Sequence, residues 1–469
     1  MQHSKKKKKN LCISEKMCTF AVENNIHTKY INMKQRLFYF LLLIIPWTDI
    51  WGQVPFTSVT IEDVDMPAAK GMVRSWKPNF AVAYQTDGTD HYFSIIENYN
   101  TVMKSVKFSG SNMFIHDMQI LGDTLYFCGS QGGVGFINFV KISDIYNSSG
   151  TNILNTGAKF SLDPTLSYTV SRMAVYYDNY GTQHVAAFGY WDEHTTPYIY
   201  RRYFLAETYF QSNGRIFTAD WAVSNSDGSH IQGPINDVVA TDHYVAFVGT
   251  SSGCSQLSIR RVNRNYVVGT QYVYNYNCPS TGNPVATAMR GDNIAVASAN
   301  TYTPVTSQIE IRSIDLGTMN MYDAQKFAAP EKSIAEDIIY APHDNKLLVI
   351  PMLWETTGDH YPVIYIDPGR TTPYNALAMT STNIRSYQIN LHDNDYFLLG
   401  GGGKVFAHYI SSLDPNDNCI NIEKYKIEAI NTIGCIEDDY YLRNLSPTYY
   451  SNNITLTEHH YNVKCIYNN

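Results

Sequence analysis

Residues 112–140 read NMFIHDMQILGDTLYFCGSQGGVGFINFV, and this stretch decides the fold class. Its apolar runs are rich in β-branched and aromatic residues and are separated by Gly and Asp, which is typical of antiparallel hairpins. The stretch predicts three short strands, at Ile115–Ile120, Leu125–Cys128 and Val134–Val140. They are joined by a tight turn at 121–124 and a loop at Gly129–Gly133. A fourth run near Ile153–Leu162 follows a gap rich in Ser, Gly and Asn, so the predicted unit has four antiparallel strands.

The same strand–turn–strand pattern recurs along the chain. Tight polar turns lie near residues 78, 123, 178, 242, 292, 344 and 393, at spacings of 45 to 64 residues. Each interval has room for two further strands, and no long amphipathic helix interrupts the series. A four-stranded unit about every fifty residues indicates a repeat fold.

This repeat resembles that of the β-propeller superfold over roughly residues 55–467. The resemblance implies an all-β chain, a β-propeller of seven blades, or of eight if the two ends build one more. Phe56–Val64 precedes the first repeat and strand-like pieces such as Ile454–Thr457 follow the last. Closure by pairing of the N- and C-terminal strands is therefore expected, because it removes exposed edges. Stacked sandwiches are the alternative, although they do not require the same pattern seven times.

The repeat carries no signature of a specific propeller family. The Gly-His and Trp-Asp dipeptides of WD repeats do not recur, and the double glycine of kelch repeats, which Gly400–Gly403 contains, does not recur in each unit. Propellers host enzymes, lectins and scaffolds alike, so the resemblance implies an architecture and leaves the function to the site residues.

The N-terminal residues differ in composition from the rest. Residues 1–32 contain the Lys5–Lys9 run and lack an apolar period, which predicts a non-structural extension. A basic patch that binds an anionic surface is the alternative. Neither interpretation makes this segment part of the repeat.

Residues 33–52 predict a signal peptide. Lys34 and Arg36 precede the apolar run Leu37–Trp47, and Gly52 offers a small residue at a cleavage point. An uncleaved N-terminal anchor is the rival interpretation. We expect residues 53–469 to form a single propeller domain without a membrane span, exported to the periplasm, the cell surface or the medium.

Charge and cysteine content limit the classes of partner. The first 52 residues hold nine of the 35 Lys and Arg and three of the 42 Asp and Glu, so the remainder has a formal charge of −13. Such a surface disfavours nucleic acid, which needs clustered Lys and Arg. We expect a monomer that meets a glycan or a protein.

Six of the eight cysteines follow the predicted cleavage point, and an even number in an exported chain permits disulfides. Cys254 and Cys278 bracket one candidate hairpin, and Cys419 and Cys435 bracket another. The alternative is that some are buried thiols, above all Cys128 within its strand. No Cys-x-x-Cys pair or His/Cys cluster indicates zinc, and no cofactor is expected.

Two long connections between second and third strands resemble each other. Tyr190–Tyr200 and Leu353–Tyr365 each have Trp, then acidic residues, then His and Pro. Flat aromatic rings beside carboxylates suit sugar recognition, so the candidate ligand-binding residues are Trp191, Asp192, Glu193, His194, Trp354, Glu355, Asp359 and His360. The alternative is that each Trp packs between blades while the acidic residues are solvated.

A second candidate site lies where the first strands of the repeats reach the central channel. Aligned positions carry charged side chains there: His116, Asp117, Arg172, Asp237, Asp337 and Arg385. Convergent carboxylates are able to share a cation or to perform acid–base chemistry. The alternative is structural, with each Asp bonded to backbone amides of the neighbouring blade.

Two functional hypotheses follow. The favoured one is an exported propeller that acts as a binding module for a glycan or protein through its long-loop face, because no Gly-x-Ser-x-Gly elbow, Walker loop or His-Glu-x-x-His is present. The alternative is a carbohydrate-active hydrolase or lyase with carboxylates at the channel. Two inward carboxyl groups about 5–10 Å apart in an open pocket would favour the enzyme, whereas carboxylates bonded to backbone would favour the binding module.

Overall fold

The described part of the chain lies within one compact unit, Thr57–Asn469, of a computed structural model. The predicted extension and signal peptide fall outside the described residues. The structure describes residues 58–63, 71–97, 101–110, 112–147, 153–161, 165–178, 180–195, 198–210, 216–223, 235–251, 254–261, 274–278, 283–300, 307–329, 334–341, 346–355, 358–381, 388–392, 396–401, 404–409, 420–432, 436–438, 443–445, 448–452, 454–459 and 463–468. Some of these strands are described by their backbone alone.

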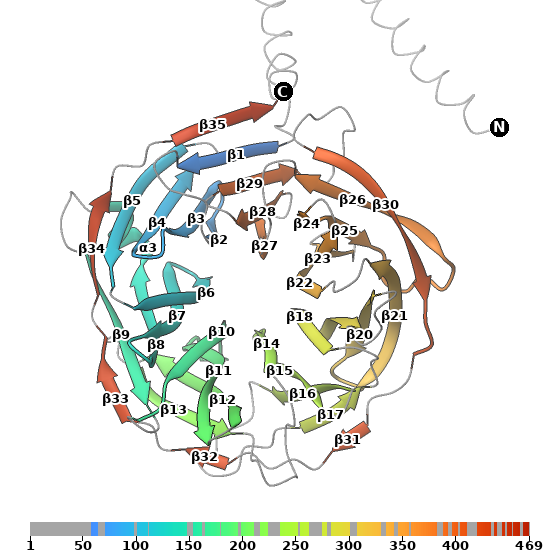
Figure 1. Ribbon diagram of the computed structural model, residues 1–469, viewed down its shortest axis with the longest axis horizontal. Coiled ribbons are helices and arrows are strands. Elements are labelled where there is room, and N and C mark those ends of the chain that lie inside the picture. The colour runs from blue at the N-terminus through green and yellow to red at the C-terminus, as the bar shows by residue number, and fades with distance from the viewer. Residues whose placement is uncertain are drawn as a thin grey trace, which may run out of the picture. The chain divides into compact units, whose positions relative to one another are not determined.

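Nearly all of the described chain is β-strand, and the strands pair antiparallel in several sheets (Figure 1). The predicted all-β class is confirmed. The described chain also contains a short helix, α3 (Ile142–Asn147), which buries Ile142 and Ile145.

Successive strands form four-stranded modules. The first contains β2 (Gly71–Lys77), β3 (Phe80–Thr86), β4 (Asp90–Glu97) and β5 (Thr101–Ser109). The second contains β6 (Met113–Leu121), β7 (Thr124–Gln131), β8 (Val134–Lys141) and β9 (Ile153–Ser161). These bounds agree within three residues with the strands predicted from the opening stretch. The predicted loop Gly129–Gly133 is wrong in length, because β7 runs to Gln131 and a turn at Gly132 and Gly133, both with positive φ, leads into β8.

The next three modules follow the same order. The third contains β10 (Tyr168–Tyr177), β11 (Gln183–Thr195), β12 (Tyr198–Phe210) and β13 (Ile216–Val223). The fourth contains β14 (Ile235–Ala240), β15 (Tyr244–Ser251), β16 (Cys254–Arg261) and β17 (Tyr274–Cys278). The fifth contains β18 (Asn283–Arg290), β19 (Asn293–Asn300), β20 (Ser307–Asp315) and β21 (Asn320–Ala329).

The remaining two modules depart from this order in one detail each. The sixth contains β22 (Ile334–Tyr340), β23 (Leu347–Glu355), β25 (Val363–Ile366) and β26 (Tyr374–Ser381), with the short strand β24 (Gly358–His360) paired to β23 alone. The last contains β27 (Gln388–His392), β28 (Tyr396–Gly401) and β29 (Lys404–Tyr409), and its fourth strand is β1 (Ser58–Asp63). A strand from the N-terminal part of the chain therefore completes the last module.

The inner strands of the modules contact one another in a closed cycle. Each contacts the next in the order β2, β6, β10, β14, β18, β22, β27, and β27 contacts β2. In Figure 1 the modules accordingly surround a common centre, with their inner strands nearest to it. Residues far apart in the sequence thus face a shared space.

The C-terminal segment runs along the outer edges of the modules. It contains β30 (Ile420–Ala429), β31 (Ile436–Asp438), β32 (Arg443–Leu445), β33 (Thr448–Ser451), β34 (Ile454–His459) and β35 (Val463–Asn468). β30 pairs with β21 and β26, and β34 pairs with β5 and β9, so each joins two modules into one sheet. β31, β32 and β33 pair with β17, β13 and β9, and β35 pairs with β1. We call β30–β35 the outer belt.

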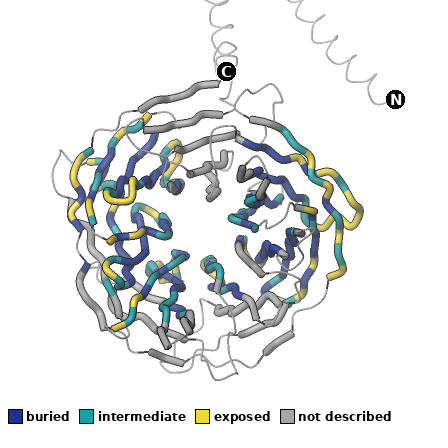
Figure 2. Tube along the Cα trace, viewed as in Figure 1, coloured by how far each residue is buried: buried dark blue, intermediate teal, exposed yellow. Residues whose placement is uncertain are grey.

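Apolar side chains fill the spaces between the sheets of successive modules. One cluster joins Tyr84 and Phe93 of the first module to Phe127 of the second, and all three are almost fully buried. Further clusters lie between the later modules, and Figure 2 shows buried residues along the strands within modules and exposed ones on β30. Each buried large side chain contributes about 1.5–3 kcal/mol by leaving water, so face-to-face burial holds the modules together.

The two long connections predicted as loops are largely hairpin strands. β11 and β12 pair without interruption from His184 with Tyr209 to Thr195 with Tyr198. β23 likewise pairs with β24 from Leu353 with His360 to Glu355 with Gly358. Backbone pairing therefore extends into both segments that the sequence predicted as long connections between second and third strands.

Candidate functional site

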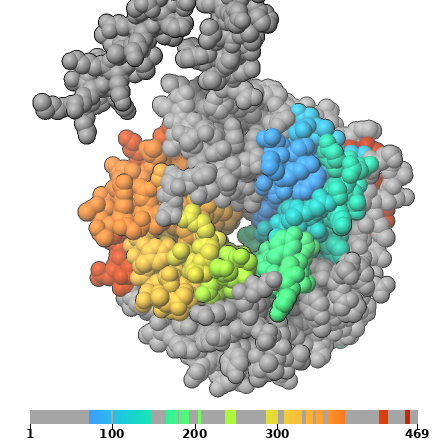
Figure 3. Space-filling view, turned by 180° about the vertical axis from the view of Figure 1, so that it is seen from behind, coloured from blue at the N-terminus to red at the C-terminus, as the bar shows by residue number. Residues whose placement is uncertain are grey.

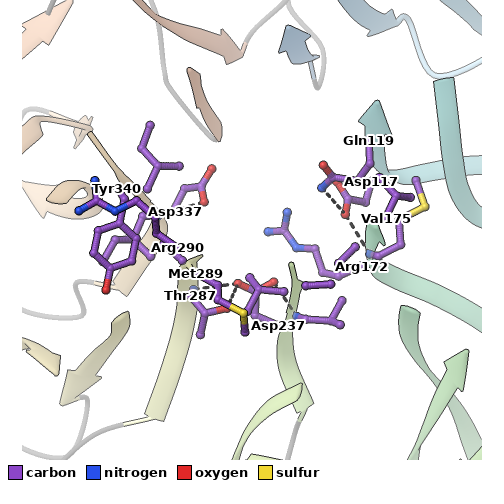
Figure 4. Close-up of a pocket in the computed structure, with 18 of the residues that line it drawn as sticks. Asp117, Gln119, Arg172, Val175, Asp237, Thr287, Met289, Arg290, Asp337 and Tyr340 are labelled. Atoms are coloured by element: carbon purple, nitrogen blue, oxygen red, sulfur yellow. Dashed lines mark hydrogen bonds between the residues drawn. The ribbon is translucent and has the colours of Figure 1, made fainter. Parts of the chain in front are cut away.

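A cavity of about 600 Å³ lies between the inner strands, and residues of β2, β6, β10, β14, β18 and β22 line it. Figure 4 shows side chains of these strands converging on it, and Figure 3 shows a hollow at the middle of the surface seen from behind. We call this cavity the central pocket. It contains four predicted site residues: Asp117, Arg172, Asp237 and Asp337.

A β-bulge precedes each of these charged residues on its inner strand. The pairing register shifts between Ile115 and Asp117, between Val170 and Arg172, between Ile235 and Asp237, and between Ala335 and Asp337. A bulge adds one residue to a strand and redirects the side chain that follows it. The repeated irregularity therefore explains why these side chains share one location in the ring.

Glycine on the second strand accommodates the bulge. A Cβ at Gly129 would lie 1.8 Å from the Phe114 carbonyl oxygen, and one at Gly189 would lie 2.1 Å from the Thr169 carbonyl oxygen. These glycines face the strand segments before the bulges of β6 and β10. Only a residue without a side chain fits there, so Gly129 and Gly189 are required for the close approach of the bulged strands.

Asp117 ties β6 to the next inner strand and also binds an arginine. Its Oδ1 accepts from the Met118 N–H at 2.8 Å and its Oδ2 accepts from the Met173 N–H of β10 at 3.0 Å. Arg74 of β2 forms an ion pair with it at 3.3 Å and donates to Gln119 at 3.3 Å. Asp117 and Arg74 are 1% and 7% exposed, so this pair is buried and its charges are compensated internally.

Asp237 repeats this arrangement between β14 and β18. It accepts from the Val238 N–H at 2.9 Å, and its Oδ2 accepts from both the N–H and the hydroxyl of Thr287 at 2.8 Å. Burial raises the pKa of the Asp237 carboxyl to about 6, although Arg172 and Thr287 act in the opposite direction. Asp337 begins the same pattern on β22, where its Oδ1 accepts from the Ile338 N–H at 2.9 Å.

Arg172 differs from the aspartates because its side chain points into the pocket (Figure 4). No hydrogen bond joins its guanidinium to another of the described residues. Burial acts to lower the pKa of Arg172, but the carboxylates of Asp117, Asp237, Asp337 and Glu336 outweigh it and raise the pKa. The guanidinium is therefore a permanent cation that presents its donors to the cavity.

The pocket wall also carries an arginine on a tyrosine. Arg290 lies over the Tyr340 ring, with 5.1 Å between its Cζ and the ring centroid, and donates to the Ala341 carbonyl oxygen at 3.0 Å. Burial is the main cause that raises the pKa of the Tyr340 hydroxyl, which stays protonated at physiological pH. Polar donors, carboxylate acceptors and an aromatic edge thus border the same space.

The remaining predicted site residues are not in this pocket. His116 occupies the bulge of β6 and is not among the pocket-lining residues. Trp191 packs beside Tyr168 at 5.8 Å and Phe204 at 6.4 Å between ring centroids, and Asp192 beside it is half-buried. Arg385 and the side chains of the other candidates lie outside the described residues: Glu193, His194, Trp354, Glu355, Asp359 and His360.

Sequence reasoning missed the Arg74 and Arg290 contributions to the pocket. The bulge of β2 lies between Ser75 and Lys77, closer to its turn than the bulges of the later strands. When the repeats are aligned by their turns, Arg74 therefore does not match the charged positions of the later inner strands. The role of Thr287 as a partner of Asp237 depends on the packing of β14 beside β18, which the sequence of one strand does not show.

The structure also bears on the cysteines, on metal binding and on a membrane span. Cys128 is buried, and its Sγ lies 4.0 Å from the Val170 carbonyl oxygen. The Cys278 backbone pairs with Ser255, next to Cys254, while the side chains of Cys254 and Cys278 and all of Cys419 and Cys435 lie outside the described residues. Within the described ranges, no group of three or more His, Cys, Asp or Glu is placed to hold a metal ion. Of the helical residues described, none forms a helix long and apolar enough to cross a membrane.

No protein-family model matches the chain, and no curated protein matches it.

Proposed function

We propose that the modules are the seven blades of a β-propeller. The closed cycle of contacts between inner strands supports this architecture, which stacked sandwiches would not produce. β1 supplies the outer strand of the blade that begins with β27, so strands from both ends of the sequence build one blade. This closure leaves no blade edge at the junction of the ring.

We further propose that this propeller is an exported binding module whose ligand enters the central pocket. The observation that carries the proposal is the division of roles among the charged residues. Both carboxylate oxygens of Asp117 and of Asp237 accept hydrogen bonds within the protein, whereas the guanidinium of Arg172 points into the cavity. A carboxylate that accepts backbone N–H groups is poorly placed to transfer a proton to a substrate.

The chemistry of the pocket favours a glycan end or a similar polyhydroxylated molecule. A volume of about 600 Å³ is within the range of small-ligand sites. The wall combines Arg172, Gln119 and carboxylates with the apolar side chains of Met289 and Ile339. Sugar hydroxyls both donate and accept hydrogen bonds, so a neutral polyol matches a wall of mixed charge better than a strongly charged ligand does.

Binding by the hairpins β11–β12 and β23–β24 is part of the same proposal. The segments around Trp191 and Trp354 extend their modules as hairpins. They are suited to contact the distal part of a longer glycan or a protein partner.

The test is a glycan-array screen with the labelled full-length protein and with an Arg172→Ala variant. We expect retention of a defined glycan set and a loss of at least about tenfold in affinity on removal of the guanidinium, since a hydrogen bond from a charged donor contributes about 1.5–3 kcal/mol. Lys424→Ala, at an exposed position on β30, is the matched control that removes an equal charge and should bind normally.

Three results would overturn this function. The first is the absence of any retained glycan, and the second is retention that survives Arg172→Ala unchanged. The third is release of reducing sugar from the same glycans that stops on Asp337→Asn, which would establish the hydrolase alternative instead.

A further inference from the structure

Three aromatic rings surround a lysine ammonium at the turn between β2 and β3. The Nζ of Lys77 lies 4.1 Å from the ring centroid of Trp76, 4.3 Å from that of Phe80 and 5.4 Å from that of Tyr146. All three distances are below the limit of about 6 Å for a cation–π interaction. The four residues belong to the described part of the chain, and we call the three rings the aromatic cage.

The planes of the three rings are steeply inclined to one another. Trp76 and Phe80 meet at 76°, Phe80 and Tyr146 at 84°, and Trp76 and Tyr146 at 56°, with centroids 5.6 to 6.1 Å apart. A ring attracts cations through the negative potential of its face. Three faces at steep angles therefore direct their attraction at one volume, which a flat stack of rings would not do.

Independent elements hold this geometry. Trp76 lies near the end of β2, Phe80 begins β3, and Tyr146 belongs to α3 of the second module. Adjacent strand residues normally point to opposite faces, but the bulge between Ser75 and Lys77 breaks that alternation and lets Trp76 and Lys77 meet. All three rings pack against the buried apolar cluster between the first two modules, so the cage does not depend on Lys77 for its shape.

Lys77 is an exposed residue at the edge of the cage. Among the described residues it forms no ion pair, so the rings are its observed partners. It is followed by exposed Pro78 and by Asn79, which has a φ of +63°, so the side chain starts from a tight surface turn. Rotation about its side-chain bonds is sufficient to move the ammonium into water and vacate the cage.

We propose that the aromatic cage is a binding site for a small trimethylammonium compound of the choline class, and that Lys77 occupies it until such a ligand arrives. A lysine ammonium is compact and strongly hydrated, so it loses hydration when it enters the cage. A trimethylammonium group carries the same charge with weaker hydration and presents methyl groups to all three ring faces. It is therefore the better occupant of the same volume.

The experiment uses ligand-observed proton NMR with the full-length protein and with tetramethylammonium, choline or phosphocholine as probes. Methyl protons held against ring faces shift upfield. We expect a weak shift with the wild type and about tenfold tighter binding with Lys77→Ala, because that variant removes the internal competitor. Sedimentation with phosphatidylcholine vesicles distinguishes a free solute from a lipid headgroup, and binding of either source through the cage supports the proposal.

The cage variants Phe80→Leu and Tyr146→Leu, each made in the Lys77→Ala background, keep apolar contact with the core but remove one ring face. Each should lose the upfield shift while its thermal unfolding stays cooperative. The proposal is overturned if Lys77→Ala produces no shift with any probe. It is equally overturned if the shift persists in a folded Tyr146→Leu or Phe80→Leu variant.

Discussion

Replacement of Asp237 by alanine should weaken the connection between two neighbouring inner strands. The Asp237 carboxylate accepts from the Val238 N–H at 2.9 Å and from the Thr287 N–H and hydroxyl at 2.8 Å. Val238 and Thr287 are each 4% exposed, so alanine leaves two buried N–H groups without their acceptor. Each such group costs about 1–3 kcal/mol. The two groups together would cost about 2–6 kcal/mol of unfolding free energy. Because water can enter from the adjoining pocket and replace an acceptor, we expect a loss in the lower half of this range, about 3 kcal/mol.

The assay is urea unfolding at neutral pH, followed by tryptophan fluorescence and far-ultraviolet circular dichroism. The midpoint should fall while the dependence on urea stays the same, which marks a change in stability and not in the unfolded state. Asp242→Ala is the matched control, because that side chain is 72% exposed and only approaches His243 at 3.9 Å. It should cost less than about 0.5 kcal/mol. Equal losses for the two variants would refute a linking role for Asp237.

Three further predictions concern the frame of the pocket. Gly129→Ala should cost about 3 kcal/mol in urea unfolding, because its Cβ would lie 1.8 Å from the Phe114 carbonyl oxygen. Gly132→Ala, with open space and a φ of +58°, should cost only about 1–2 kcal/mol, and equal costs would contradict the steric argument. The pKa of Asp237 is about 6 in the folded protein and about 3.9 in the unfolded chain, so the folded state retains a proton that the unfolded state has released. The stability that this proton supplies is complete below about pH 4 and is lost as the pH rises to about 6. The difference in unfolding free energy between wild type and Asp237→Asn should fall over that window, and a flat difference would exclude the raised pKa. Finally, truncation after residue 432 should expose the edges of β1, β5, β9, β13 and β17 and cause self-association. Light scattering coupled to size exclusion measures it, and a truncated protein that remains monomeric at all concentrations would show that the outer belt does not protect these edges.

The repeated strands were predictable because their signals are local. β6 to β9 follow the opening stretch closely, since alternating apolar residues and Gly or Asp turns act over a few positions. The charged positions Asp117, Asp237 and Asp337 followed from alignment of these turns. The inter-strand hydrogen-bond partners of Asp117 and Asp237 lie about fifty residues away on the next inner strand, and a single strand contains no signal for them.

The outer belt and the aromatic cage were not predictable for a related reason. β31 and β32 have three residues each, which is too short for a period to be visible, and their partners lie more than 150 residues earlier. The cage requires both the bulge in β2 and the position of Tyr146 in the next module. Both features arise from tertiary contacts between segments that look ordinary when read alone.

Two sets of connections hold the inner strands around the pocket. At the centre, Asp117 joins β6 to β10 and Asp237 joins β14 to β18 through backbone N–H groups. At the periphery, β34 joins β5 to β9 and β30 joins β21 to β26. The central links fix the positions of neighbouring inner strands, and the outer strands oppose separation of the modules. These hydrogen bonds occupy the carboxylates of Asp117 and Asp237, whereas the Arg172 guanidinium forms no hydrogen bond with the described residues. If Arg172 contacts the ligand as we propose, a change at Arg172 should alter binding without the loss of stability expected at Asp237.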